Sequence, residues 1–377
     1  MTNPDYENYT DLMWLNDVVR DGELGPIEPL AFKPSRDRLF YFDHSSPEFI
    51  ALPFVTRFGY DEESEYGAST VKVEFDGETL IYSLNSVRRT EIERLVRDNR
   101  LPPGYWRLFC SHLQLSIYTT QYTFPEGGMF LDFGDAPKFD KPVLAYCTSK
   151  PAHFCVVDPF FIISKAYFRL QSELEKNTLA LADKRDKVFW RGSASGIRTT
   201  FANSQRYLLC SKMQQSKHHE RLDFGIIDTP DPVLKQLMEE LGEIPEFAQP
   251  ATRVSPDTFS LYRYGVDVDG NSNSWGGFFT KMLSRAYLIR VASWDGFRQW
   301  YYPRLSSQDL YALVAPDLSD FDEVLDRVFS LSIQEITDKA QRLYEFASSM
   351  AVFDEIDRNN AELHQWLKDT ARTEQGM

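Results

Sequence analysis

The chain has few cysteines and no long hydrophobic run. Its 377 residues include four cysteines, Cys110, Cys147, Cys155 and Cys210, and none of them forms a CxxC pair. This pattern excludes a disulfide framework and gives no zinc or thioredoxin motif, so we expect small buried thiols in a reducing compartment. The longest apolar stretches, such as Pro159–Ile163, fall far short of the roughly 20 residues that a membrane-spanning helix needs.

A basic excess and a secretory leader are also missing. The chain has 41 Lys and Arg against 56 Asp and Glu, a formal net charge of −15. General nucleic-acid binding needs a cationic surface, so this balance argues against it. The first residues, MTNPDYENYTDLMW, contain no basic segment followed by an apolar one. We therefore expect a soluble, cytoplasmic protein without a transmembrane segment and without a nucleic-acid partner.

Aromatic and apolar side chains, by contrast, are plentiful. Hydrophobic residues make up 42% of the chain and aromatic residues 14%, which excludes a disordered chain. The length is typical of roughly two or three domains.

The hydrophobic pattern predicts strands that alternate with helices. Residues 70–75 and 78–84 flank an Asp76-Gly77 turn and predict a hairpin, and further strands are expected at 113–118, 129–133, 143–146, 188–190, 222–227, 264–268 and 287–291. Helices are expected over 86–100, over 168–187 with its charged connection, and over 196–213, 278–283 and 354–371. Helix starts are expected at Asp320 and Ser332, the second in a capping box with Glu335. This alternation implies βαβ units, a mostly parallel sheet and an α/β fold.

The first candidate site is the segment VFWRGSASGIR, residues 188–198. A short strand runs into small residues and then into an amphipathic helix, which places free backbone N–H groups at a helix N-terminus and so predicts an anion site. Gly192 allows a ligand to approach closely, and Ser193 adds a hydroxyl. The guanidinium groups of Arg191 and Arg198 suit phosphate oxygens. The loop matches neither GxGxxG nor the P-loop pattern, so an ordinary β–α turn is the alternative.

The second candidate site is YRYGVDVDGNSNSW, residues 262–275. It again passes from a strand to small polar residues and a helix, and Asn273 or Ser274 is expected to cap that helix. Side chains of this loop can reach a sugar or a phosphate, and the residues concerned are Asp269, Gly270, Asn271, Ser272, Asn273, Ser274 and Trp275. A plain turn at Asp269-Gly270 is the alternative.

Metal binding is not predicted. Asp267-Val268-Asp269 superficially resembles a metal-binding DxD pair, but we expect its two carboxylates on opposite faces of the strand. The six histidines form no metal-ligand pattern.

The third candidate site is Asp135, in the run LDFGDAP. A carboxylate that follows an apolar strand lies at the sheet edge where α/β proteins bind ligands, and it can act as a general base when a hydroxyl comes within reach. Asp132 is the rival carboxylate. A turn-forming role for Asp135 before Ala-Pro is the alternative.

Together, the runs FWRGSASGIR, YRYGVDVDGNSNSW and FRQWYYPRL…LYALVAPDLSDFDEVL resemble glycosyltransferase family 90 over about residues 135–327. That family contains protein O-glucosyltransferases, fungal capsule xylosyltransferases and bacterial lipopolysaccharide-modifying enzymes. The resemblance implies a GT-B fold, in which two Rossmann-like domains face each other across a cleft and C-terminal helices follow. The acceptor-side domain would cover residues 1–165, the nucleotide-sugar-binding domain 166–345, and a helical segment 346–377.

The activity implied by this resemblance is an inverting transfer from a UDP-sugar. A glucose- or xylose-type sugar would move to a hydroxyl of a glycan, lipopolysaccharide or capsule acceptor, with no metal and no tightly bound cofactor. The absence of a eukaryotic secretory signal and retention tail favours a bacterial enzyme.

The resemblance also assigns residues. Asp135 corresponds to the general base, Ser193 and Arg198 to diphosphate contacts, and residues 271–275 to the donor cradle. A substrate-binding loop near the cleft corresponds to Asp158, Pro159 and Phe160.

One departure concerns Gly276-Gly277, where several eukaryotic members carry an arginine. Lys281 and Arg285 are the candidates to compensate for it.

Two other functions fit the sequence. A glycoside hydrolase would need a second carboxyl group about 5 to 10 Å from the first, and no pattern nominates one. A non-catalytic carbohydrate- or nucleotide-binding protein is the other, and the departure at Gly276 favours it.

Overall fold

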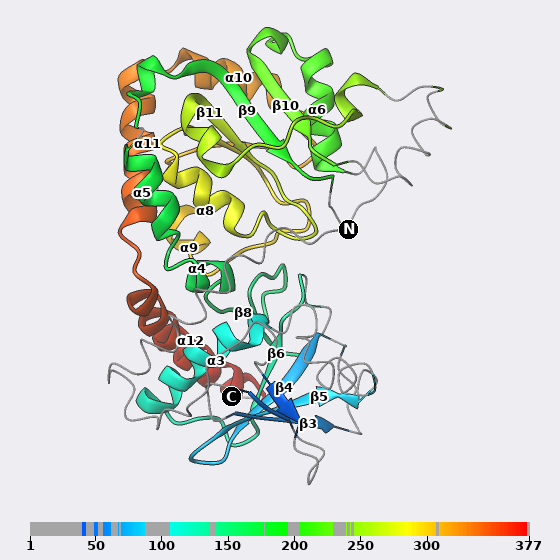
Figure 1. Ribbon diagram of the computed structural model, residues 1–377, viewed down its shortest axis with the longest axis vertical. Helices are drawn as coiled ribbons and strands as arrows, with labels where there is room; N and C mark the ends of the chain where they lie inside the picture. Colours follow the sequence, from blue (N-terminus) through cyan, green and yellow to red (C-terminus); the bar gives the residue numbers. More distant parts are fainter. Residues whose placement is uncertain are drawn as a thin grey trace. The chain divides into compact units, whose positions relative to one another are not determined.

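The chain divides into two compact units, residues 1–166 with 351–377 and residues 167–350 (Figure 1). The computed structural model describes residues 40–42, 49–51, 56–61, 67, 69–86, 90, 106–135, 137, 141–176, 178–194, 204–228, 239, 242, 245–306 and 309–374. The division lies beside the boundary expected between 165 and 166. Residues 351–377, which the sequence analysis placed in a separate helical segment, belong to the N-terminal unit.

The N-terminal unit is built on a mixed sheet. Its eight described strands are β1 (Phe40–Phe42), β2 (Phe49–Ala51), β3 (Thr56–Asp61), β4 (Thr70–Phe75), β5 (Leu80–Asn85), β6 (Met129–Asp132), β7 (Leu144–Ala145) and β8 (Phe154–Cys155). Their order across the sheet is β1-β2-β3-β5-β4-β6-β7-β8. β3 and β5 pair in parallel, as do β6, β7 and β8, whereas the remaining pairs are antiparallel.

The predicted hairpin is confirmed in β4 and β5. Oδ1 of Asp76 accepts hydrogen bonds from the backbone N–H groups of Glu78 (2.9 Å) and Thr79 (2.7 Å). Gly77 has a φ of 103°, a left-handed conformation that favours glycine. The turn chemistry therefore sets the register in which β4 and β5 pair.

Helix α3 (Trp106–Gln121) replaces the strand predicted over 113–118, so that prediction was wrong. The alternation of Leu113, Leu115 and Ile117 suggested a strand. In the structure α3 is buried on nearly all sides along this stretch, and all three side chains are buried. A helix that is buried all round has no polar stripe, so its 3.6-residue period disappears from the sequence. The helix predicted over 86–100 lies largely outside the described residues.

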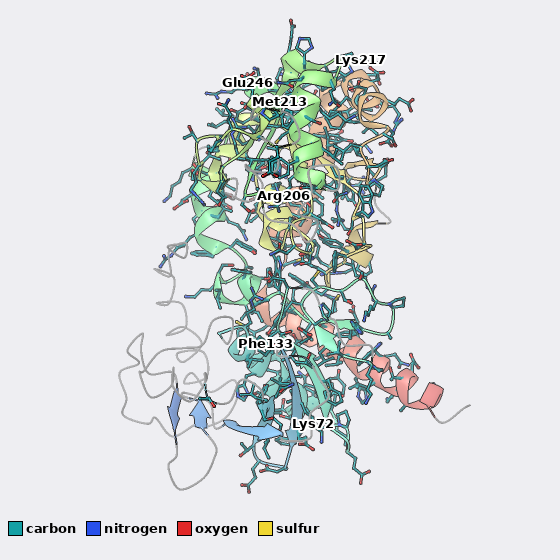
Figure 2. The ribbon with its side chains drawn as sticks, turned by 90° about the vertical axis from the view of Figure 1, so that its right-hand side faces the viewer. Lys72, Phe133, Arg206, Met213, Lys217 and Glu246 are labelled. Carbon is teal, nitrogen blue, oxygen red and sulfur yellow. The ribbon has the colours of Figure 1, made fainter. Side chains whose placement is uncertain are left out.

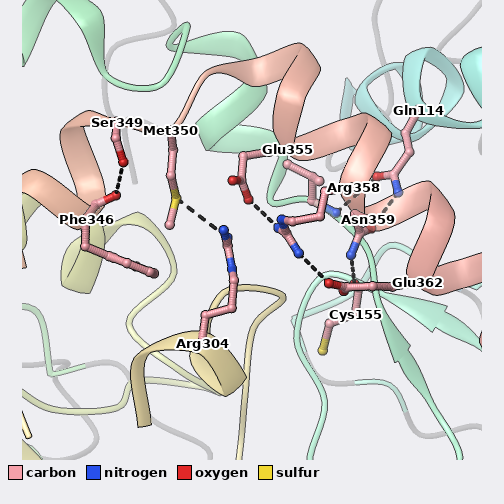
Figure 3. Close-up of polar contacts among 11 residues, drawn as sticks. Gln114, Cys155, Arg304, Phe346, Ser349, Met350, Glu355, Arg358, Asn359 and Glu362 are labelled. Carbon is pink, nitrogen blue, oxygen red and sulfur yellow. Dashed lines mark hydrogen bonds and ion pairs between the residues drawn. The ribbon is translucent and has the colours of Figure 1, made fainter. Parts of the chain in front are cut away.

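Helix α12 (Val352–Glu374) packs against α3 and completes the N-terminal unit. Nε2 of Gln114 donates to the side-chain oxygens of Asn359 (2.6 Å) and Asn360 (3.2 Å), and Asn359 Nδ2 donates to the carbonyl oxygen of Cys155 (3.1 Å) (Figure 3). Buried amides need such partners, so this network fixes the position of α12. The short helix α4 (Pro159–Ile163) belongs to the same unit.

The C-terminal unit is built on a five-stranded parallel sheet with the order β10-β9-β11-β12-β13. The strands are β9 (Arg185–Gly192), β10 (Leu222–Ile226), β11 (Tyr262–Asp267), β12 (Tyr287–Val291) and β13 (Ala312–Val314). The helices are α5 (Phe168–Lys176), η3 (Leu181–Asp183), α6 (Gln205–Gln215), η5 (His219–Arg221), η6 (Glu246–Ala248), η7 (Pro256–Leu261), α8 (Gly276–Leu283), α9 (Tyr302–Ser306), α10 (Phe321–Ser330) and α11 (Ile333–Ser348). α8 packs against α5 and α11, whereas α6 lies beside β10 (Figure 1).

Burial on both faces explains why these strands were readable in the sequence. All five residues of β12 are buried, and four of them are apolar. Central strands of parallel sheets are covered on both sides and therefore appear as nearly continuous hydrophobic runs. The expected capping box is present, because Ser332 Oγ accepts from Glu335 N and Glu335 Oε2 accepts from Ser332 N. The predicted α/β class, with a Rossmann-like parallel sheet and C-terminal helices, is confirmed.

The remaining broad expectations concern cysteines and membranes. The four cysteines are free and buried, as expected. None of the described helices is both long and apolar enough to cross a membrane.

Candidate active site

The strand order places a ligand site at one edge of the parallel sheet. Counted along the chain, the order is 2-1-3-4-5, so the direction of winding reverses between β9 and β11. Right-handed crossovers then carry the chain to opposite faces of the sheet after these two strands, which opens a crevice at their carboxyl ends. The two loops that follow β9 and β11 are the first two candidate sites found in the sequence.

Arg191 has partners within the sheet. Its guanidinium donates to the carboxylate (2.6 Å) and carbonyl oxygen (2.9 Å) of Asp223 on β10, and it packs over the ring of Phe189. These bonds engage donors that a phosphate would use. The structure therefore explains Arg191 by its role within the sheet, and the diphosphate contact predicted for it stays a prediction.

Gly192 is required by packing. A Cβ built on it would lie 2.5 Å from Cζ2 of Trp190, a contact that no side chain can make. The absent side chain makes room for the buried indole two residues earlier. Close approach of a ligand, the reason given in the sequence analysis, is not needed to explain this glycine.

Arg206, at the start of α6, joins the two loops and was missed by the sequence analysis. Its NH1 donates to the carbonyl oxygen (2.8 Å) and hydroxyl (3.2 Å) of Ser193, and its Nε donates to the carbonyl oxygen of Asp269 (2.9 Å). Figure 2 labels Arg206 among the side chains of the C-terminal unit. These bonds hold Ser193 and Asp269 beside each other. An arginine at the start of a helix carries no local signal, because its partners lie in two loops that come together only in the fold.

Arg198 lies outside the described residues, and its predicted diphosphate contact stays a prediction. The helix predicted over 196–213 is described as α6 from Gln205 onward.

The loop after β11 is buried and polar at once. Ser272 and Asn273 are 0% and 1% exposed. Among the described residues, no hydrogen-bond partner is found for Ser272 Oγ and Asn273 Nδ2. Asp269 and Ser274 lie in the same loop, where the Ser293 hydroxyl acts on Asp269 and the Ser274 hydroxyl on Asp267. Buried polar atoms are almost always paired, and a cluster of unpaired ones indicates a missing ligand or water. Gly270 and Asn271 form the more exposed start of this loop.

The helix that follows this loop begins differently from the prediction. Its N-cap is Trp275, not Asn273 or Ser274, and no described side chain caps it. Asn273 Oδ1 instead accepts from Trp275 N (2.8 Å), and this turn holds Trp275 at a φ of 50°. A left-handed conformation is rare for an aromatic residue and is concentrated at functional sites.

The first turn of α8 has features that favour an anion, although the N–H of Gly277 already donates to the carbonyl oxygen of Ser274 (2.8 Å). It contains Gly276 and Gly277 and has no acidic residue. A Cβ on Gly276 would lie 2.0 Å from the hydroxyl oxygen of Tyr167, so no larger residue fits there. A helix N-terminus carries a partial positive charge and exposed N–H groups, which favour a bound anion.

A buried ion-pair cluster lies beneath this turn. Lys281 Nζ is 2.8 Å from Oδ1 of Asp267, and Arg290 Nε is 4.0 Å from its Oδ2. Burial raises the pKa of Asp267, but the nearby cations outweigh it and hold that pKa below its ordinary value. Lys281 is thus engaged with Asp267, and Arg285 packs over the ring of Tyr344 at 3.8 Å. Lys281 and Arg285 were the candidates to replace the arginine that several eukaryotic members carry at Gly276-Gly277. Their contacts with Asp267 and Tyr344 do not test that role.

Asp269 has the most perturbed carboxyl group of the site. Burial raises its pKa from 3.8 to about 7, and Asp267 adds to the shift, whereas the Ser293 hydroxyl, Arg290 and Arg206 oppose it. Asp267 and Asp269 therefore act on each other, and residues two apart in an extended segment share a face. The expectation that they lie on opposite faces was wrong. Among the described residues, no group of three or more His, Cys, Asp or Glu side chains is arranged to hold a metal ion.

Asp135 lies in the N-terminal unit, three residues beyond β6. Its Oδ1 is 3.0 Å from NH1 of Arg107, which also donates to the carbonyl oxygen of Phe133 (2.9 Å). The Asp135 side chain is 39% exposed. Arg107 therefore orients a carboxylate that solvent and substrate can still reach. Its rival Asp132 is buried and accepts from Thr70 Oγ1 (2.9 Å) and Gly134 N (2.8 Å), so it serves the loop itself.

Asp158 caps a helix. Its Oδ1 accepts from the N–H groups of Phe160 (2.6 Å) and Phe161 (3.3 Å), and Pro159 occupies the first turn of α4. Asp158 is 1% exposed. These bonds explain the residue without a substrate, and the substrate-binding role assigned to Asp158, Pro159 and Phe160 stays a prediction.

Comparisons with known proteins return structures only. No family model and no curated protein matches the sequence. Solved structures similar to the chain include the α,α-trehalose 6-phosphate synthase of Burkholderia multivorans (10% identity, 84% of this chain and 91% of that chain, TM-score 0.37). The UDP-forming α,α-trehalose-phosphate synthase of Burkholderia vietnamiensis is another (10%, 82% and 93%, TM-score 0.39). A third is WaaG, a glycosyltransferase involved in lipopolysaccharide biosynthesis (11%, 51% and 50%, TM-score 0.32). No activity follows from similarity at this level.

Proposed function

We propose that the chain is a glycosyltransferase of the GT-B type, related to family 90, which takes its donor sugar from a UDP-sugar. One observation carries the proposal: at the carboxyl edge of the parallel sheet, the buried Ser272 hydroxyl and Asn273 amide nitrogen have no hydrogen-bond partner among the described residues, and they lie next to the N-terminus of α8, which no described side chain caps. A ligand with hydroxyl groups and an anionic group satisfies both features, and a nucleotide sugar has both.

Different residues of the site would bind different parts of the nucleotide sugar. The carboxylate of Asp269 can accept hydrogen bonds from two neighbouring hydroxyls of a ribose or a sugar. The Asn273 amide and the Ser272 and Ser274 hydroxyls can donate to donor oxygens. The N–H groups of the first turn of α8 suit a diphosphate, and Arg206 holds the loops after β9 and β11 in the geometry that creates the site.

Asp135 supplies the proposed base. In an inverting transfer, the acceptor hydroxyl attacks the anomeric carbon, its proton passes to a carboxylate, and the bond to the diphosphate breaks. A half-exposed carboxylate oriented by Arg107 suits this role. The acceptor we propose is a hydroxyl of a glycan, lipopolysaccharide or capsule, and the sugar is of the glucose or xylose type.

The test is a screen of nucleotide sugars for binding and for slow hydrolysis without an acceptor. We expect stabilisation by UDP-sugars and release of UDP. Binding of a nucleotide sugar without any turnover would instead indicate a binding protein. Cleavage of an oligosaccharide without a nucleotide sugar would indicate a glycoside hydrolase.

Asp135 and the stereochemistry are tested next. Asp135→Asn is expected to abolish transfer and to leave donor binding intact, with Glu126→Gln as the matched control. Full turnover by Asp135→Asn would remove Asp135 as the base. The anomeric configuration of the product, measured by NMR, tests inversion directly, because a product with the donor's configuration contradicts it.

A further inference from the structure

Arg290 interrupts an otherwise apolar strand. It is the fourth residue of β12, is 8% exposed, and lies one residue before the carboxyl end of the strand. Burying a guanidinium is costly unless it is paired and hydrogen-bonded. The position therefore calls for a partner.

The described residues give the Arg290 guanidinium an ion pair but no hydrogen bond to its Nε. Among the described residues, no hydrogen-bond partner is found for Nε of Arg290, and its ion pair with Asp267, at 4.0 Å, is too long for a hydrogen bond. The other oxygen of Asp267 is held by Lys281 at 2.8 Å. Arg290 thus shares Asp267 with Lys281, and its charge also acts on the buried Asp269. None of the described side chains accepts a hydrogen bond from its Nε.

The guanidinium lies beside the first turn of α8. Its central carbon lies 4.9 Å from the ring centroid of Phe278, the third residue of α8, and 4.0 Å from that of Tyr302. Packing against ring faces leaves the N–H edge of an arginine available for bonds in its own plane. The hydroxyl of Tyr301, fully buried, is also without a hydrogen-bond partner among the described residues.

The charge of Arg290, its position beside α8 and the lack of a described partner for its Nε all favour a bound anion. We propose that Arg290 and the N-terminus of α8 together bind the diphosphate group of the donor, an inference that rests on the proposed function. The planar fork of Arg290 would donate to phosphate oxygens, and the helix N–H groups would approach the same anion from α8. This assignment gives the site its arginine from β12, whereas the sequence analysis sought it at positions 191 and 198.

The test compares UDP with uridine in binding calorimetry. Arg290→Gln is expected to weaken UDP binding by about 10- to 100-fold, the range for losing a charged hydrogen-bonding group, and to leave uridine binding unchanged. The matched control is Arg221→Gln, because Arg221 also packs over an aromatic ring (Phe329, 3.5 Å) but precedes β10 at the opposite edge of the sheet. The control is expected to bind UDP as the wild type does.

The possible results distinguish a failure of the Arg290 assignment from a failure of the proposed glycosyltransferase function. A wild-type chain that binds neither UDP nor a UDP-sugar contradicts the proposed function. A wild-type chain that binds UDP, with Arg290→Gln equally tight, overturns the inference alone. If Arg290→Gln does not fold, Arg290→Lys decides: it keeps the charge but not the fork, so weaker UDP binding supports the proposal and unchanged binding overturns it.

Discussion

Lys281 and Asp267 form a buried ion pair with an Nζ–Oδ1 distance of 2.8 Å, and the exposed fractions of the two side chains are only 8% and 1%. Removing Lys281 leaves the buried Asp267 carboxylate with only the longer ion pair to Arg290, at 4.0 Å. The pair therefore contributes to stability mainly through the penalty for breaking it.

The first prediction concerns this pair. Lys281→Met is expected to lower the free energy of unfolding by about 3 to 5 kcal/mol, measured by denaturant titration. The exposed pair Lys339–Asp309 (2.7 Å) is the control, and Lys339→Met should cost at most about 1 kcal/mol. Equal effects of the two variants would contradict the prediction.

The second prediction concerns the pH dependence of stability. The pKa of Asp269 is raised from 3.8 to about 7, so the folded state holds a proton that the unfolded state has lost. The contribution is fully present below about pH 4 and is lost as the pH rises through 7, with an upper size of about 4 kcal/mol. Asp269→Asn should flatten the unfolding free energy between these pH values. An unchanged slope in the variant would show that another group is responsible.

The third prediction concerns Arg206. Arg206→Gln removes the bonds to Ser193 and to the Asp269 carbonyl, so the loops after β9 and β11 lose their link. We expect about a 10-fold loss of UDP affinity together with a lower Tm. Arg253→Gln is the control, since that guanidinium is 67% exposed and lies 3.8 Å from Asp228. A variant of Arg206 that binds UDP normally would show that the loops hold their geometry unaided.

The fourth prediction concerns Gly276. Gly276→Ala places a methyl group 2.0 Å from the Tyr167 hydroxyl oxygen and should cost about 1 to 3 kcal/mol of stability. Gly127→Ala, whose added Cβ meets no atom within 4 Å, should cost almost nothing. Tyr167→Phe should rescue part of the loss in a double-mutant cycle. Additive costs in that cycle would mean that the hydroxyl is not what excludes the side chain.

Elements of this fold that depend on neighbouring residues could be predicted from the sequence. The strand at 287–291 and the capping box at Ser332 were predicted as found, because hydrophobic runs and caps depend only on neighbouring residues. The small polar loop after β11 was also recognised. Burial on all sides hid α3, because it removed the helical period around Leu113.

The identity of the site's arginines could not be predicted. Arg191 looked like a phosphate ligand, but its partner Asp223 lies on the neighbouring strand β10. Arg206 and Arg290 carry no motif, and their surroundings exist only once β9, β11 and β12 are aligned. Strand order decides which charges meet, and no local pattern encodes it.

The contacts of α12 also set an order of events in folding. Gln114 hydrogen-bonds to Asn359 and Asn360, about 245 residues later in the chain. Residues 167–350 form a contiguous unit, whereas the other unit needs residues from both sides of it. During synthesis, the inserted unit can close its core first. The earlier-translated unit cannot complete its buried amide network until α12 has been synthesised, so the apolar surface of α3 lacks its α12 partner during that interval.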